Sequence, residues 1–189
     1  MDKPRLPIPQ HQRYKIGRQF LVALLLIGLF GFNSKVSQCN QFASINNQSQ
    51  SFKGDFEGEI EGAMTQASGA QGLEDLRAAA EEYTGAVEKI TGKIDGMTQD
   101  LEGLSIGDEQ LDEYRDRYIT IVTDSQAALS SASNAMQLVA EAQSEDEFRK
   151  IFDSFQTQAN SAFSDLQSLS VEESTLIEQV NAYCGAEAE

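Results

Sequence analysis

Three long hydrophobic seams constrain the fold of this chain more than any other feature. Apolar residues recur at alternating spacings of three and four in residues 73–104, 111–142 and 148–183. That spacing places them on one face of a helix and is typical of helices that pack in coiled-coil fashion. No proline follows Pro9, so no seam residue lacks the backbone N–H that a helix needs. The sequence therefore predicts three long helices.

The stretch before these seams, residues 37–72, allows two interpretations. It is rich in Gln, Asn, Ser and Gly, which is typical of a flexible tether. It also carries apolar residues at roughly helical spacing, so a weak amphipathic helix is the alternative. If this stretch is helical, the chain is an all-α, antiparallel up-down bundle: three long helices in residues 73–184 plus a weaker N-terminal helix. Residues 185–189 would then form a short tail.

Local signals predict where two of the long helices begin and leave the course of the last one open. Asp108 is expected to cap the second helix, and Ser144 with Glu147 is expected to form a capping box before the third. The unbroken phase of the third seam favours one continuous helix. Glu173 is the only polar residue in that seam, and it marks a helix break near Ser170, a register device or a polar pocket. Of these three, we favour the break.

A hydrophobic segment lies near the N-terminus, behind a basic head of residues 1–19. The run from Phe20 through Leu26 to Phe32 is the only continuous apolar run in the chain. Its length suits a signal peptide. As a membrane anchor or signal segment it covers residues 20–36, and extension back to Ile16 gives 21 residues up to Val36, enough for a membrane span if Arg18 and Lys35 reach the two interfaces. The basic head predicts an N-terminus in the cytoplasm and a C-terminal domain outside it.

Three fates are open for this segment. Cleavage before Asn40 has poor support, because Ser37-Gln38-Cys39 is only the best of weak candidate sites. Lipidation of Cys39 also has a poor context, because Gln38 stands where a small residue is expected before the lipidated cysteine. We therefore expect an uncleaved, single-pass anchor in the cell membrane. A secreted protein and a lipoprotein are the alternatives.

The rest of the chain is strongly acidic. Residues 40–189 hold 8 basic and 29 acidic side chains. Such a surface repels phosphates, so we expect no nucleic acid partner. It is typical of a solvated, soluble face. The expected partners are the membrane, through the N-terminal segment, and a protein that the sequence does not identify.

The two cysteines, Cys39 and Cys184, are related by the predicted topology. In an up-down bundle of four helices, the first helix starts and the last helix ends at the same end. The two cysteines would then be neighbours, and a disulfide is feasible outside the cytoplasm. The alternative is a lipidated or removed Cys39 and a free thiol at Cys184.

The sequence contains no recognisable catalytic or metal-binding motif. His11 is the only histidine and lies in the basic head, so a histidine-based catalytic set in the acidic body is excluded. The same absence removes the common histidine-containing zinc, haem and di-iron sites from the body. We expect no enzymatic activity, no cofactor and no metal site.

Weak motifs suggest a resemblance. The stretch LDEYRDRY at residues 111–118 and the ending NAYCG at residues 181–185 accompany a signal-like segment with a cysteine. Together they resemble small, uncharacterised helical envelope proteins of bacteria, of a lipoprotein-like, cyanobacterial type. The resemblance implies no activity and no functional residues.

Two functions remain as expectations. The first is a membrane-anchored, extracytoplasmic helical bundle that acts as a structural or protein-interaction module without catalysis. The alternative is a bundle that senses a small ligand between its helices. A polar pocket around Tyr118, Ser125 and Glu173 would mark the second function.

Overall fold

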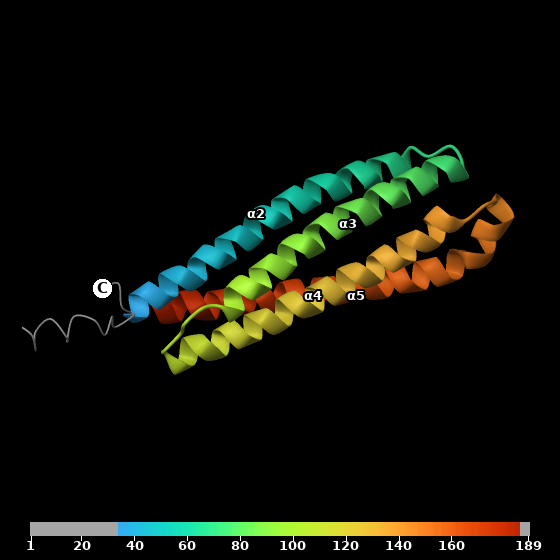
Figure 1. The fold of residues 1–189 in the computed structure, drawn as a ribbon. Coiled ribbons are helices and arrows are strands. Elements are labelled where there is room, and N and C mark those ends of the chain that lie inside the picture. The colour runs from blue at the N-terminus through green and yellow to red at the C-terminus, as the bar shows by residue number, and fades with distance from the viewer. Residues whose placement is uncertain (1–33, 186–189) are drawn as a thin grey trace, which may run out of the picture. The chain divides into compact units, whose positions relative to one another are not determined.

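The structure is a computed structural model that describes residues 34–185. Four helices occupy this range: α2 (Lys35–Ser68), α3 (Leu73–Glu102), α4 (Glu109–Glu141) and α5 (Glu145–Gly185). The four helices pack against one another lengthwise (Figure 1). The stretch that allowed either a tether or a helix is thus helical up to Ser68. The predicted anchor or signal segment, residues 20–36, lies outside the described residues except for its last three. Ser34 caps α2, and Lys35 and Val36 begin the helix.

Within residues 34–185, no helix is both long and apolar enough to cross a bilayer.

The predicted helix starts are confirmed by side-chain caps. The carboxylate of Asp108 accepts a 3.0 Å hydrogen bond from the backbone N–H of Leu111. At the start of α5, the Ser144 hydroxyl accepts a bond from the N–H of Glu147. The Glu147 carboxylate reaches back to the N–H of Gln143, one residue earlier than in the usual capping box. These bonds satisfy backbone donors that the first turn of a helix leaves without partners.

The last helix is continuous, as the unbroken phase of its seam predicted, and the break favoured as the meaning of Glu173 is wrong. α5 passes through Ser170 and Glu173 and ends only at Gly185. The Glu173 carboxylate turns inward and is met by polar groups from two other helices. Because its hydrogen bonds are satisfied there, a polar residue at a seam position does not require the helix to end.

The seams form the core. The side chains that are fully or almost fully buried come from all four helices, and the largest of them are Tyr118, Phe42, Leu101, Leu111 and Leu176. Buried alanines, among them Ala132 and Ala135 of α4 and Ala159 and Ala162 of α5, carry the seams through the region where α4 and α5 pack together. Small side chains allow two helix backbones to approach closely.

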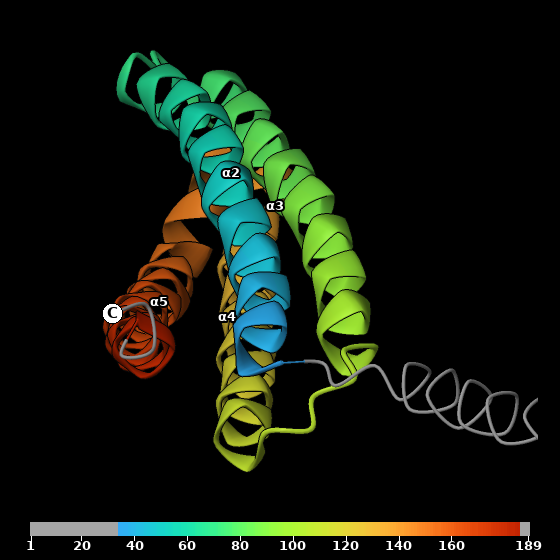
Figure 2. The same ribbon diagram turned by 90° about the vertical axis from the view of Figure 1, so that its left-hand side faces the viewer.

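The four helices do not surround this core on all sides. Each helix packs extensively against its neighbour in the sequence, whereas α2 and α5 touch at few points. Figures 1 and 2 show α2 and α5 near each other where α2 begins and α5 ends, and well separated toward the far end. One long edge of the assembly is therefore open.

Candidate ligand-binding cleft

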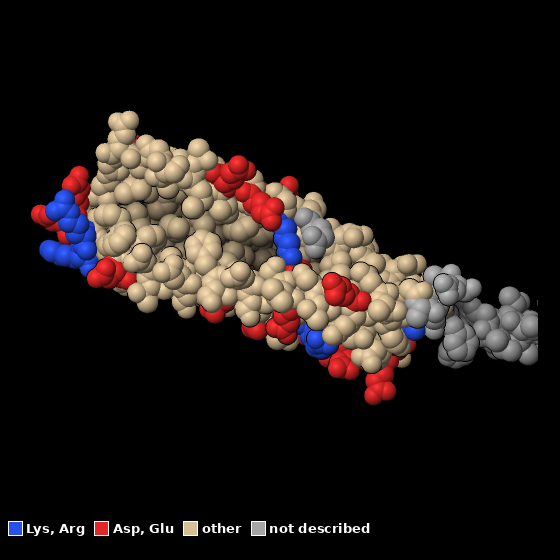
Figure 3. All heavy atoms as spheres, turned by 180° about the vertical axis from the view of Figure 1, so that it is seen from behind, with Lys and Arg blue, Asp and Glu red and all other residues tan. Residues whose placement is uncertain are grey.

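A cleft of about 300 Å³ lies along this open edge. Its walls come from α2 and α5, and side chains of α3 and α4 form its floor. Most of its lining is apolar: Phe52, Phe56, Ile90, Ile94, Met97, Ile121, Val122, Leu129 and Leu166. Figure 3 shows the hollowed face, where the visible surface of the hollow is mostly uncharged and charged side chains lie toward its margins.

The cleft exists because apolar seam residues of α2 have no partner helix opposite them. Phe52 and Phe56 follow the α2 seam, yet they are only partly buried, whereas Phe42 and Ile45 near the start of α2 are fully buried. The difference follows the widening gap between α2 and α5. The sequence thus supplies an apolar face that the fold leaves accessible.

Polar groups gather around one position of the cleft, the carboxylate of Glu173. Its Oε1 atom is 3.2 Å from the hydroxyl of Tyr118 and 3.4 Å from that of Ser49. Its Oε2 atom accepts a hydrogen bond from the ammonium group of Lys53. The side chain of Glu173 is 9% exposed and that of Lys53 is 44% exposed. A buried carboxylate is thereby paired with a half-exposed cation at the rim.

Tyr118 supports the Glu173 carboxylate from the core side of the cleft. It is fully buried, its ring packs against Phe42, and its hydroxyl also lies 3.3 Å from the side-chain oxygen of Asn46. Burial, with the nearby charge of Glu173, raises the pKa of Tyr118 well above its usual range. The hydroxyl therefore keeps its proton and serves as a hydrogen-bond donor.

The charged groups that line the cleft do not balance. They are the ammonium of Lys53 and the carboxylates of Glu57 and Glu173. The lining therefore carries one negative charge in excess, within a body that is itself acidic.

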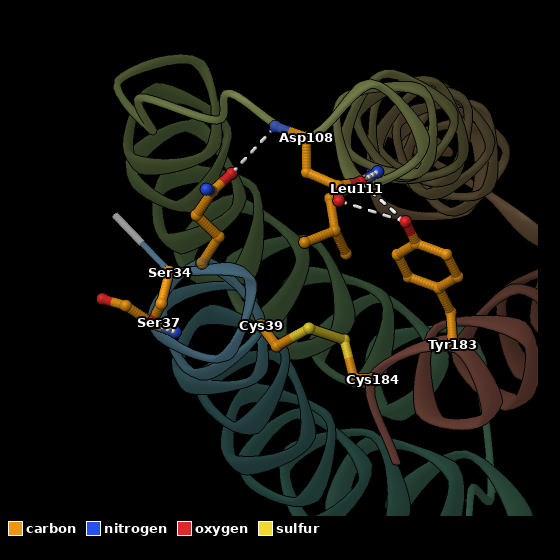
Figure 4. Close-up of a disulfide and its surroundings, with 8 residues drawn as sticks. Ser34, Ser37, Cys39, Asp108, Leu111, Tyr183 and Cys184 are labelled. Atoms are coloured by element: carbon orange, nitrogen blue, oxygen red, sulfur yellow. Dashed lines mark hydrogen bonds between the residues drawn. A yellow bond between two sulfur atoms is a disulfide. The ribbon is translucent and has the colours of Figure 1, made fainter. Parts of the chain in front are cut away.

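The end of the molecule where α2 and α5 meet is fastened covalently. Cys39 and Cys184 form a disulfide with their Cα atoms 5.9 Å apart, in the range of ordinary disulfides (Figure 4). A sulfur in a disulfide cannot carry a lipid chain, so this arrangement favours the disulfide over acylation of Cys39.

Hydrogen bonds reinforce the same end. The side-chain oxygen of Gln38 accepts bonds from the N–H groups of Gly107 and Asp108, which joins α2 to the connection between α3 and α4. The hydroxyl of Tyr183 lies 3.0 Å and 3.1 Å from the two carboxylate oxygens of Asp108 (Figure 4). Gln38, which departs from a lipoprotein pattern, has a structural role here.

No family model, curated protein or solved structure matches this chain.

The function of the cleft must therefore be argued from its own residues. Of the three residues that the sequence suggested as pocket markers, Glu173 and Ser125 line the cleft, and Tyr118 supports it through the bond to Glu173. Sequence reasoning missed Ser49 and Lys53. Ser49 did carry a signal, because it is a polar residue at a seam position of α2, and Glu173 is the same exception in α5.

Proposed function

We propose that residues 34–185 form an antiparallel up-down bundle that binds a small, mostly apolar molecule in the cleft between α2 and α5. The observation that carries the proposal is the cleft itself, with apolar walls and one polar cluster around Glu173. This combination is typical of small-molecule sites, and about 300 Å³ is at the lower end of their size range. The proposal includes no catalytic step.

The proposed setting is the outer side of a cell membrane. The N-terminal apolar segment would hold the bundle there, with the basic head in the cytoplasm. Two features support this setting: disulfides persist in oxidising compartments, and an acidic surface keeps an exposed domain soluble.

Filling the cleft tests the binding function. The Ser125→Leu variant should place an isobutyl group in the cleft, while Ser131→Leu makes the same change on the exposed face of α4. The two serines are matched, because each hydroxyl donates only to a carbonyl one turn earlier in the helix. We expect the neutral dye Nile red and n-octanol to bind the wild-type chain and Ser131→Leu with similar affinity. Both should bind Ser125→Leu more weakly. Equal binding to all three proteins, or no binding to any, would contradict the proposal.

A protein-interaction module is the second candidate, and exposed aromatic residues favour it. Phe152 and Phe163 of α5 are 41% and 47% exposed, and Phe152 packs edge to face with Phe148. Large exposed aromatic residues are common at protein interfaces. A photo-crosslinking residue at position 163 should then capture one defined partner in membranes, and a matched probe at the exposed Ser131 should not. Identical products from both positions would count against this function.

A further inference from the structure

We infer that the ligand of this cleft is a monocationic amphiphile, such as an amine with a short apolar chain, whose charged head binds at Glu173. This inference rests on the proposed binding function and adds the chemical class of the ligand.

The first argument is the way in which the two carboxylate oxygens of Glu173 are held. Oε1 receives the hydroxyls of Tyr118 and Ser49, which fix the carboxylate from the protein side. Among the described residues, Oε2 has a single partner, the ammonium group of Lys53. Oε1 is thus held by hydrogen bonds to two other helices, and Oε2 binds a cation.

The second argument is that Lys53 can be replaced at little cost. Its side chain is nearly half exposed, and a flexible ammonium at a rim can return to water easily. Glu173 cannot move in the same way, because its side chain is 9% exposed and held by two hydroxyls. An entering ammonium can therefore take the place of Lys53 on Oε2, whereas an entering carboxylate would have to approach a fixed carboxylate.

The third argument is the charge of the lining. Lys53, Glu57 and Glu173 leave one negative charge in excess, which a single positive charge neutralises. The surrounding body, with 29 acidic and 8 basic side chains in residues 40–189, also attracts cations and repels anions. The apolar remainder of the cleft, which includes Phe52 and Phe56, fits a short hydrocarbon or aromatic body.

The test compares three ligands with one chain length: n-octylamine, n-octanol and octanoate. Each is titrated calorimetrically into the full, disulfide-bonded chain at neutral pH, and Ser125→Leu measured under the same conditions gives the background outside the cleft. We expect octylamine to bind about tenfold more tightly than octanol, because of a charge-assisted hydrogen bond to Oε2. Octanoate should bind more weakly than octanol.

Two variants locate the preference. In Glu173→Gln, octylamine and octanol should bind with equal affinity, because the charge is lost while the shape is kept. In Lys53→Gln, octylamine should bind more tightly than to the wild type, because its competitor is removed. Circular dichroism of each variant checks that the fold is intact.

The outcomes separate the two proposals. Cleft-dependent binding of all three ligands with equal affinity, or tightest binding of octanoate, would overturn the cationic preference and leave the binding function standing. An octylamine preference that survives Glu173→Gln would overturn the assignment of the head group to Glu173. Absence of cleft-dependent binding for every ligand would overturn both.

Discussion

The hydroxyl of Tyr118 in α4 lies 3.2 Å from the carboxylate of Glu173 in α5, in the interior of the molecule. Through Ser49 and Lys53, the same carboxylate also reaches α2. One acidic side chain thereby links three helices at the level of the cleft. A single buried polar group in an otherwise apolar seam can fix the register of packed helices, because every shifted register leaves that group without partners.

Glu173→Ala should lower the free energy of unfolding by about 2–3 kcal/mol. The variant removes the acceptor of the buried Ser49 hydroxyl and the charged acceptor of Tyr118, whose hydroxyl keeps the Asn46 side-chain oxygen. An unsatisfied buried group costs about 1–3 kcal/mol, and a lost hydrogen bond to a charged group adds to that loss. Urea denaturation measures the change. Glu172→Ala, one residue earlier and exposed, should change stability by less than about 0.5 kcal/mol.

A double variant sharpens this prediction. When Tyr118→Phe is combined with Glu173→Leu, the donor and the acceptor disappear together, so the loss should be smaller than the sum of the two single losses. Additive losses would mean that the two side chains do not interact in solution.

Loss of the disulfide should destabilise the bundle by about 4–5 kcal/mol. The bond joins cysteines separated by 145 residues, and the entropy that it removes from the unfolded chain grows with the size of the closed loop. Denaturation of the wild type with and without reductant, and of the Cys39→Ser/Cys184→Ser variant, measures the change. The reductant should have no effect on the double variant. Equal midpoints for the oxidised and reduced wild type would contradict the prediction.

Asp108 should make stability depend on pH in the acid range. The backbone N–H of Leu111, aided by the hydroxyl of Tyr183, holds the pKa of the Asp108 carboxyl below its usual value of 3.8. A lowered pKa in the folded state means that the contribution is complete above the usual pKa and is lost as the pH falls through the folded value. Asp108→Asn keeps the cap but lacks the charge.

The measurement is a set of urea titrations from neutral pH down to about pH 3. The wild type should be more stable than Asp108→Asn at neutral pH, and the gap should shrink on acidification below about pH 4. Glu109→Gln is the control, because it removes an exposed carboxylate from the same first turn. Its stability should exceed that of Asp108→Asn by the same pH-dependent difference as the wild type shows. A gap that stays constant with pH would exclude Asp108 as the responsible group.

Two glycines in α2 offer a stabilising change. Gly54 and Gly58 lie inside the helix, and a Cβ atom added at either position would meet nothing within 4 Å. Alanine at both should therefore raise the free energy of unfolding by about 1–2 kcal/mol, through helix propensity alone. Thermal and urea denaturation test this. Destabilisation would contradict the prediction.

The long helices could be predicted from the sequence, because seam spacing and capping residues are local signals. The break near Ser170 was wrong because the partners of Glu173 are far away in the sequence: Ser49 is 124 residues distant and Tyr118 is 55. A local pattern reports that a polar group occupies a seam, but not which groups from other helices will satisfy it.

The sequence suggested a polar pocket near Ser125 and Glu173, but the open edge and the apolar walls of the cleft could not be predicted, for a related reason. A seam indicates which face of a helix is apolar, but it does not indicate how far apart two such faces will stand. Here the buried alanines of α4 and α5, such as Ala132 and Ala162, allow close packing of that pair. α5 is held against α4, and Phe52 and Phe56 of α2 remain partly uncovered.

The bond between Cys39 and Cys184 also changes the connectivity of the molecule. It turns residues 39–184 into a covalent ring, in which α5 leads back to α2 through two sulfur atoms. Each of the four described helices then has two covalent neighbours, and none is first or last. A protease that cuts one connection between helices would open the ring without releasing a fragment, so the nicked molecule would fall into two pieces only after reduction.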